Sequence, residues 1–185
     1  WKAVKSLREE GYMIEAGPNK GYMLMKANDR LSVEAIRPFL SFPDVYIKVY
    51  QEVDSTNRAA KAAAVTGEAG HGSFVLAGCQ TEGRGRRGRS FYSPQDAGIY
   101  LSVVLEPKGS LQESLLLTAE AAVAVYKAVK KVTGIDLDIK WVNDLYHNGK
   151  KVCGILTEAV TDFESGNIEF AVVGIGLNIF EAAEG

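Results

Sequence analysis

The hydrophobic positions at the start of the chain predict one helix followed by a small hairpin. In residues 1–10 the apolar side chains recur at helical intervals. Two short apolar stretches, 12–14 and 21–25, then flank a turn sequence rich in glycine, proline and asparagine, a pattern typical of paired strands. Residues 27–44 return to helical spacing and end at Pro43, and we expect them to form a connector.

From Val45 onward, short apolar runs alternate with polar loops and helical patterns. Apolar runs of strand length occur at 45–53, 74–79, 99–105, 135–142 and 168–179. Helical patterns occupy 58–65 and about 111–132, the second after a capping box at Ser110–Glu113. This succession predicts an α+β fold, with a mostly antiparallel sheet and helices packed on one side.

An Asn-Gly dipeptide at 148–149 predicts a hairpin with a two-residue type I′ turn. The pairs that follow from this turn are His147 with Lys150, Tyr146 with Lys151, Asp144 with Cys153 and Lys140 with Thr157. Because paired residues share a face of a sheet, Lys140, Asp144 and Lys151 should project together. A carboxylate between two lysines suits a phosphate with its metal. A solvated face with an ion pair explains the same residues equally well.

The composition is that of an ordinary soluble domain. The chain has 185 residues, of which 46% are hydrophobic and 24% charged, and this balance excludes disordered, collagen-like and disulfide-stapled classes. Cys79 and Cys153 stand far apart, which favours free thiols in a reducing compartment. The most apolar run, 115–125, is well short of the roughly 20 residues that a membrane span needs. We therefore expect a soluble, cytoplasmic protein with no membrane partner.

Positive charge is concentrated in one short loop. The net charge is −2, yet residues 80–93 carry four arginines against one glutamate, and residues 1–26 carry five basic residues against three glutamates. In Gly83–Arg89, glycines let the backbone approach an anion, and arginines present forked donors to carboxylate or phosphate. A flexible basic loop or an RNA-binding tract explains this composition equally well. The acidic remainder of the chain favours a discrete anionic ligand.

Two further motifs combine polar groups with glycines. Asp54–Asn57 precedes a helix and offers hydroxyls and amide N–H groups to a polar ligand, although ordinary helix capping explains it more simply. Gly174–Asn178 lacks the third glycine and the following helix of a dinucleotide fingerprint. A strand whose glycines admit a ligand is the better interpretation. His71 and His147 have no partner at metal-ligand spacing.

Taken in order, these motifs resemble those of the biotin protein ligase family, also called biotin–[acetyl-CoA-carboxylase] ligases. The matching segments are Asp54–Asn57, Gln80–Arg89, Lys140–Asp144, Lys150–Glu158 and Gly174–Asn178. Each motif is weak by itself, but five in this order are specific, and they cover about residues 45–180. The resemblance implies a class II synthetase-like catalytic domain.

The resemblance also implies a domain organisation. Residues 1–26 resemble the recognition helix and wing of the winged helix-turn-helix in bifunctional ligase/repressors. Residues 27–44 would be the connector and 45–185 the biotin- and ATP-binding catalytic domain. Because family members continue into an SH3-like domain, we expect a chain truncated at both ends. Operator DNA is then a partner only of a full-length form, and a homodimer fits the family.

The activity implied by the resemblance has two steps. Biotin and ATP, with Mg²⁺, give biotinyl-5′-AMP and pyrophosphate, and a lysine of a biotin carboxyl carrier protein then takes the biotinyl group. A lipoate–protein ligase is one alternative, which the Gly-Arg-rich loop disfavours. A biotin-sensing repressor without catalysis is another, which the retained Lys151, Arg84 and Arg86 disfavour.

The resemblance carries roles over to the matching residues. Biotin would be bound by Ser55, Thr56, Asn57, Gln80, Gly83, Arg84, Gly85, Arg86, Lys151, Gly154, Gly174 and Gly176. The nucleotide would be bound by Arg86, Arg89, Phe91, Lys140, Asn143 and Asn178, with magnesium at Asp144. Lys151, Arg84 and Arg86 would be the catalytic cations. This chain has Val142 where the family usually has proline, and Phe91 where it often has tryptophan.

Overall fold

The computed structural model describes residues 1–9, 12–17, 21–24, 31–42, 44–107, 111–161 and 168–180. The chain divides into two compact units, Trp1–Pro43 and Asp44–Gly185. The capping box expected at Ser110–Glu113 begins outside the described residues. No helix in the described part of the chain is long and apolar enough to cross a membrane.

The first unit contains the predicted helix and hairpin. Helix α1 (Lys2–Glu9) is followed by β1 (Ile14–Gly17) and β2 (Gly21–Leu24), which pair antiparallel. The guanidinium of Arg8 donates to the carbonyl of Ile14, which ties the helix to the hairpin. Of the expected connector, Val33–Ile36 forms α2 and Arg37–Phe39 a 3₁₀ turn, η1.

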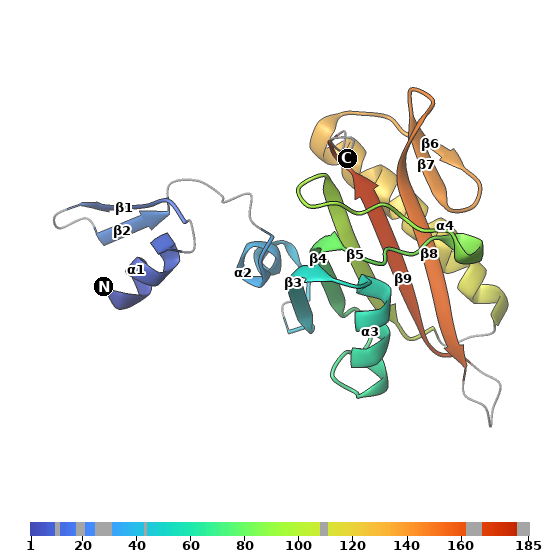
Figure 1. Ribbon diagram of the computed structural model, residues 1–185, viewed down its shortest axis with the longest axis horizontal. Coiled ribbons are helices and arrows are strands. Elements are labelled where there is room, and N and C mark those ends of the chain that lie inside the picture. Colours follow the sequence, from blue (N-terminus) through green and yellow to red (C-terminus); the bar gives the residue numbers. More distant parts are fainter. Residues whose placement is uncertain are drawn as a thin grey trace. The chain divides into compact units, whose positions relative to one another are not determined.

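The second unit is built on a seven-stranded sheet with the order β3-β4-β5-β9-β8-β7-β6 (Figure 1). Its strands are β3 (Ile47–Val53), β4 (Phe74–Gln80), β5 (Gly98–Leu105), β6 (Asp138–Lys140), β7 (Asp144–His147), β8 (Lys150–Thr161) and β9 (Ile168–Asn178). The β3–β4 pair is parallel and the other pairs are antiparallel. The α+β class and the mostly antiparallel sheet are therefore confirmed.

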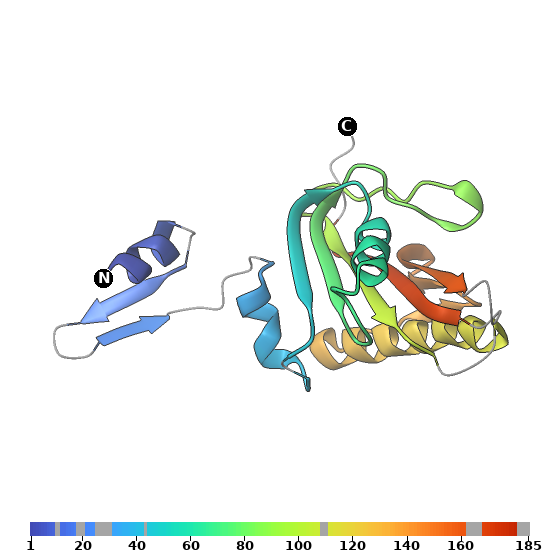
Figure 2. The same ribbon diagram turned by 90° about the horizontal axis from the view of Figure 1, so that it is seen from below.

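Helices α3 (Thr56–Val65) and α4 (Leu111–Thr133) cover opposite faces of this sheet, in contrast to the predicted packing of helices on one side. Neighbouring residues of β9 separate the two cores, since side chains alternate between faces along a strand. Val172 packs with Ala60 and Ala63 of α3, and Val173 packs with Ala122 of α4. Figure 2 shows the strands between α3 and α4.

The predicted strand at 135–142 is shorter than expected. Only Asp138–Lys140 pairs with β7, and residues 141–143 form a turn in which the Trp141–Val142 peptide is cis. Leu137 is buried, whereas Ile139 is 41% exposed and Trp141 is 79% exposed. The centre of this segment is therefore a strand, but its apolar side chains beyond Leu137 leave the core.

The predicted β7–β8 hairpin forms, with one correction to its register. Asn148 and Gly149 have φ values of 50° and 76°, as a type I′ turn requires. Tyr146 pairs with Lys151 as expected. A bulge between Leu145 and Tyr146 then shifts the register by one residue, because a bulge places two residues opposite one.

The bulge and the turn at 141–143 each change the predicted partner of one charged residue. Asp144 pairs with Gly154 and not with Cys153. Lys140, expected opposite Thr157, pairs with Asp144 across β6 and β7.

Candidate functional site

The site is a pocket on the α3 face of the sheet, where glycines replace side chains on adjacent strands. Gly154 of β8 lies opposite Gly176 of β9, and Gly174 follows on the same face. A Cβ at Gly176 would lie 2.3 Å from Cε1 of Phe91, and one at Gly154 would lie 2.9 Å from Cε2 of the same ring. The ring of Phe91 therefore lies against bare backbone, and the pocket has a floor of main chain.

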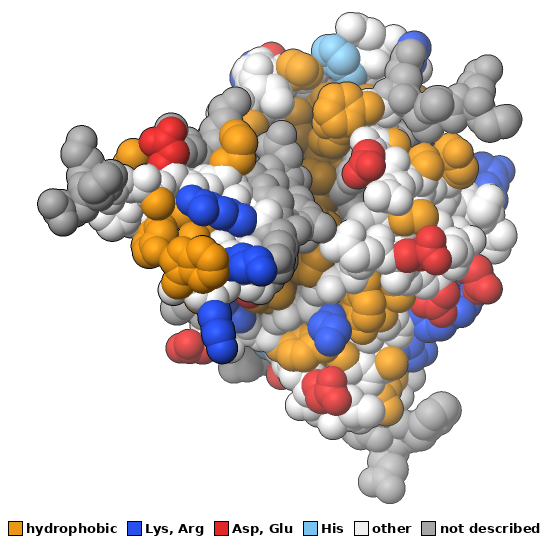
Figure 3. All heavy atoms as spheres, turned by 60° about the vertical axis from the view of Figure 1, so that its left-hand side comes forward, with side chains coloured by type: hydrophobic (Ala, Val, Ile, Leu, Met, Phe, Trp, Pro, Cys, Tyr) orange, Lys and Arg blue, Asp and Glu red, His pale blue; other side chains and the backbone are white. Residues whose placement is uncertain are grey.

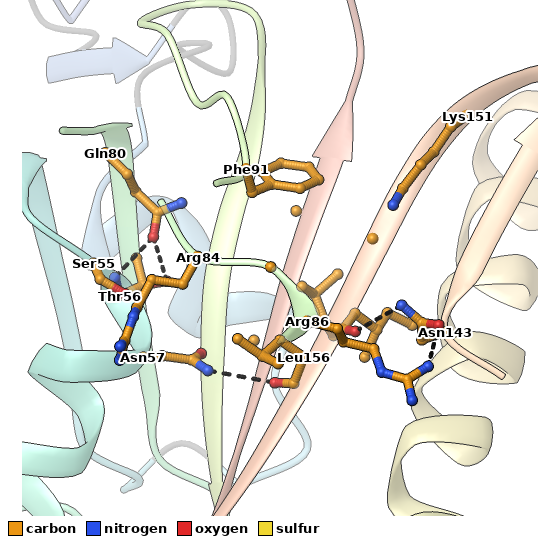
Figure 4. A pocket seen from close by; sticks show the side chains of 16 residues that line it. Ser55, Thr56, Asn57, Gln80, Arg84, Arg86, Phe91, Asn143, Lys151 and Leu156 are labelled. Atoms are coloured by element: carbon orange, nitrogen blue, oxygen red, sulfur yellow. Dashed lines mark hydrogen bonds between the residues drawn. The ribbon is translucent and has the colours of Figure 1, made fainter. Parts of the chain in front are cut away.

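Sixteen residues line this pocket and form two chemically different ends (Figure 4). Its empty volume, open solvent included, is about 470 Å³. One side, here called the amide end, carries Ser55, Thr56, Asn57, Gln80 and Arg84. The other, the cation end, carries Arg86, Asn143 and Lys151, and Phe91 lies between the two ends.

The start of α3 organises the amide end. Ser55, Thr56 and Asn57 are 1%, 3% and 5% exposed. The amide N–H of Thr56 donates to Oε1 of Gln80 at 2.8 Å, and its hydroxyl donates to the same atom at 3.0 Å. The Ser55 hydroxyl forms no cap bond and no hydrogen bond to any described side chain. Ser55 lines the pocket, and no buried side-chain polar atom of the described residues lacks a partner, so its hydroxyl is open to the pocket and can bond a ligand.

Two serines that the sequence analysis did not single out hold the amide end in place. Gln80 Nε2 donates to the Ser93 hydroxyl at 2.8 Å, and this orientation leaves the side-chain oxygen of Gln80, Oε1, facing Thr56. The buried Ser102 hydroxyl donates to Oδ1 of Asn57 at 2.6 Å. A polar residue inside the apolar run 99–105 was a usable signal for Ser102. Nothing in the sequence places Ser93 beside Gln80.

The basic loop is a short hairpin over the pocket. The carbonyl of Gly83 accepts from the N–H of Phe91 at 2.8 Å, and the N–H of Gly85 donates to the carbonyl of Arg89 at 2.7 Å. A Cβ at Gly83 would lie 2.2 Å from the Phe91 carbonyl oxygen, so this close approach requires glycine. At its tip, Arg87 has a φ of 55°.

Two arginines of this loop reach back to the sheet. Arg86 Nη1 donates to Oδ1 of Asn143 at 2.8 Å. Arg84 Nη1 lies 3.6 Å from Oε1 of Glu158. The loop is thereby connected to both ends of the pocket by charged side chains. Glu158 ends the matching segment Lys150–Glu158, and the family resemblance predicted no role for it.

The cation end is centred on Lys151. Its Nζ lies 2.8 Å from Oδ1 of Asp144, and the same oxygen accepts from Nδ2 of Asn143 at 2.9 Å. The bulge that shifted Asp144 opposite Gly154 turns its carboxylate toward this group. The predicted proximity of Asp144 and Lys151 is therefore correct, although the register that predicted it was off by one residue.

The remaining predicted residues lie around the pocket. Arg89 lines the hollows on both sides of the loop hairpin. Asn178 lines an adjoining hollow together with Phe91, Lys151 and Phe180. Lys140 lines none of these hollows, and its ammonium lies 5.3 Å from the ring centroid of Tyr146.

A structural cysteine lies directly behind the floor of the pocket. Cys153 belongs to the core under α4, and burial raises the pKa of its thiol to about 12. A thiol with this pKa is protonated near neutral pH, so Cys153 is not a nucleophile. On the surface, the hydrogen bonds that Arg58 donates to Glu82 and then to Asp54 raise the pKa of its guanidinium, and they join the start of α3 to the base of the loop.

The magnesium site predicted at Asp144 gains no support from the arrangement of donors. The described residues include no group of three or more His, Cys, Asp or Glu that could hold a metal ion. The Asp144 carboxylate already faces Lys151 and Asn143. Magnesium is commonly held by one or two carboxylates together with substrate phosphates, so Asp144 alone does not make a protein cage.

Comparisons with known proteins associate this pocket with one family. The sequence pattern of the biotin/lipoate A/B protein ligase family matches residues 49–178. The chain is 38% identical over 185 residues to the bifunctional ligase/repressor BirA of Bacillus spizizenii. This alignment covers 100% of this chain and 56% of the relative. It is 39% identical over 136 residues to a biotin–[acetyl-CoA-carboxylase] ligase of Paracoccus denitrificans, covering 71% of this chain and 53% of the relative.

A solved structure supports the same association. The biotin protein ligase of Aquifex aeolicus in complex with biotin and ATP superposes with a TM-score of 0.61 and 32% identity, covering 76% of this chain and 55% of that chain. The chain thus spans little more than half the length of the relatives that it matches.

Proposed function

Because this chain belongs to the biotin/lipoate A/B protein ligase family, we propose that it activates biotin with ATP and transfers it to a lysine of a carrier protein. The observation that supports this most is one pocket with a preorganised amide end and a separate cation end. A ligand that fits both must have a polar, nearly neutral head and a distant anionic group. Biotin, with its ureido head and its carboxylate tail, is such a molecule.

The amide end would hold the bicyclic head of biotin. A ureido group offers two N–H donors and one carbonyl acceptor. The Ser55 hydroxyl lines the pocket, forms no helix-cap bond and can supply either role. The backbone at Gly154 and Gly176 lies against the ring of Phe91, so the ring of biotin would lie on this floor once the Phe91 side chain has moved aside. Phe91 would then cover the bound ring, with the aromatic surface that a tryptophan provides elsewhere in the family.

The cation end would hold the reacting groups. In the first step, a carboxylate oxygen of biotin attacks the α-phosphorus of ATP, and pyrophosphate leaves with its bonding electrons. In the second, a lysine amine attacks the acyl carbon of biotinyl-5′-AMP, and AMP leaves. Both steps concentrate negative charge on phosphoryl or acyl oxygens, so fixed cations stabilise their transition states. Lys151 and Arg86 would be those cations, with Arg84 nearer the biotin head.

Asn143 and Asp144 would orient these cations. Asn143 accepts from Arg86 and donates to Asp144, and Asp144 faces Lys151. One chain of polar contacts therefore sets the positions of two cations, and positioning of reacting groups contributes strongly to catalysis. Magnesium, bound through ATP, would neutralise phosphate charge, with Asp144 as its candidate protein ligand. Asn178 and Arg89 would belong to the nucleotide side of the site.

Partners follow from the same proposal. The acceptor is a biotin carboxyl carrier domain, and the reaction belongs in the cytoplasm. The name of the Bacillus relative includes a repressor, and the order of α1, β1 and β2 is that of a recognition helix and wing. We therefore propose operator binding and a homodimer only for a longer form of this protein.

The proposal predicts biotin-dependent exchange of pyrophosphate into ATP by this chain. Lys151→Ala should reduce that exchange by about two orders of magnitude or more, the effect of removing one donor to a developing charge. Lys127→Ala, a change at an exposed lysine of α4, should leave exchange within about twofold. Exchange in Lys151→Ala near the unmodified rate would contradict the assignment of Lys151. Calorimetric titration with biotin and then lipoate separates the two ligase activities, and tighter binding of lipoate would overturn the proposal.

A further inference from the structure

One buried amide, the side chain of Asn57, spans three neighbouring strands at the amide end. A Cβ at Gly174 of β9 would lie 2.1 Å from its Oδ1, so Asn57 lies directly on the backbone of that strand. Its Oδ1 accepts from Ser102 of β5 at 2.6 Å. Its Nδ2 faces β8, where it donates to the carbonyl of Leu156 at 3.4 Å (Figure 4). Every polar atom of this amide is therefore used in one orientation.

The second hydrogen of that amide leads to Glu158. Asn57 Nδ2 donates to Oε2 of Glu158 at 2.7 Å, the shortest contact that this nitrogen makes. The other carboxylate oxygen, Oε1, faces Nη1 of Arg84 at 3.6 Å. One carboxylate thus links the fixed wall of the pocket, at the start of α3, to the loop hairpin that covers it.

We propose that Glu158 is a positioning residue for the ligand at the amide end. It orients Asn57 through one oxygen and holds Arg84 over the pocket through the other. A carboxylate can do both because both of its oxygens accept hydrogen bonds and carry negative charge. A glutamine at this position keeps one acceptor for Asn57 but turns an uncharged NH₂ group toward the guanidinium. Arg84 is then no longer held before the ligand arrives.

The expected effect is a loss of preorganisation. Ordering a long side chain at the moment of binding lowers affinity, and 52% of the Arg84 side chain is exposed when it is paired. This inference rests on the proposed function, because the ligand used to measure it is biotin. It goes beyond that function by giving a role to a residue that need not contact the ligand.

The test compares two glutamates that each pair with an arginine. Glu158→Gln should raise the dissociation constant for biotin about fivefold, in keeping with one partly exposed ion pair. Glu82→Gln, at the base of the same loop, breaks the Arg58–Glu82 pair of 2.9 Å. This variant should change the dissociation constant for biotin less than about twofold. Both constants are measured by calorimetry, with thermal melts to confirm that each variant is folded.

A double-mutant cycle separates positioning from a general structural role. In an Arg84→Met background, Glu158→Gln should lose most of its effect on biotin affinity, because contacting residues are energetically coupled. An unchanged or tighter affinity in Glu158→Gln overturns the inference, and so does an equal cost in both backgrounds. If the unmodified chain binds no biotin, the proposed function fails instead. Biotin binding by the unmodified chain with an unaffected Glu158→Gln variant refutes the role of Glu158 alone.

Discussion

At the scale of single residues, the site depends on where side chains are absent. Glycines at 154, 174 and 176 place no side chain on the floor of the pocket, and the side chains of Phe91 and Asn57 lie against their backbone. The closest of these contacts is between Gly174 and Asn57, where an added Cβ would lie 2.1 Å from Oδ1. The glycine and the asparagine therefore form one unit, in which the backbone of β9 determines where a buried amide lies.

We expect Gly174→Ala to displace Asn57 and to disrupt the amide end. Loss of partners for a buried amide costs about 1–3 kcal/mol, so the free energy of unfolding in urea should fall by about that amount. Biotin affinity should fall about tenfold or more, since 1.4 kcal/mol corresponds to a factor of ten. Gly70→Ala is the control, because its Cβ would meet only Glu106 Oε1, at 3.4 Å. A Gly174→Ala variant with unchanged biotin affinity would show that Asn57 is dispensable.

At the scale of elements, β8 serves two purposes through its alternation. Cys153 and Ile155 face α4 and belong to one hydrophobic core, and Gly154 and Leu156 face the pocket. The same twelve-residue strand carries Lys151 of the cation end and, further along, Glu158 at the amide end. The two ends of the pocket are therefore held at a fixed separation by one strand, which is anchored from behind by α4.

The buried thiol of Cys153 predicts a pH dependence of stability. Its pKa rises from an ordinary 9.0 to about 12 because burial disfavours the thiolate. A group whose pKa is raised by folding contributes stability that is complete below the unfolded pKa and is lost as pH rises toward the folded one. Between pH 9 and 12 the folded state binds more protons, so stability should fall by up to about 1.4 kcal/mol per pH unit.

Urea denaturation at pH 8, 9, 10 and 10.5 tests this dependence against Cys153→Ala. The variant leaves a small cavity and is less stable at every pH, so the comparison is between slopes. Tyrosines and lysines titrate in both proteins and cancel in the difference. The unmodified chain should lose stability more steeply above pH 9. Parallel slopes would mean that Cys153 is not shielded from water.

At the scale of the whole molecule, all of the candidate site lies in one of the two compact units. Every residue that lines the pocket lies between Ser55 and Gly176, inside the unit Asp44–Gly185. Figure 3 shows acidic and basic side chains on the face that it draws. The basic loop at Gly83–Arg89 belongs to the unit Asp44–Gly185.

The second unit should bind biotin without the first. A chain of residues 44–185 should show a biotin dissociation constant within about twofold of the full chain, because every residue that lines the pocket belongs to the second unit. Calorimetry of both chains under the same conditions provides the measurement. A large loss of affinity in the shorter chain, with its thermal transition retained, would show that residues 1–43 contribute to the site.

Local patterns in the sequence were sufficient for the elements and for much of the site. Periodicity predicted α1, the β1–β2 hairpin and most strands, because a side chain's face follows from spacing alone. The Asn-Gly dipeptide predicted the β7–β8 turn, since φ above zero favours these residues. The loop glycines and arginines predicted an anion site, and the order of five motifs identified the family.

What the tertiary structure decided was which of these residues meet. The bulge at Leu145 moved Asp144 onto the pocket face, and the turn at 141–143 left Lys140 outside the described hollows. Ser93 belongs to the site through its contact with Gln80, 13 positions away in the sequence. Glu158 belongs to it through its contact with Asn57, 101 positions away. Local periodicity cannot predict such contacts, because one inserted residue reverses the faces of a strand. The sequence by itself therefore determined the elements and the chemistry available, and packing determined how that chemistry is arranged.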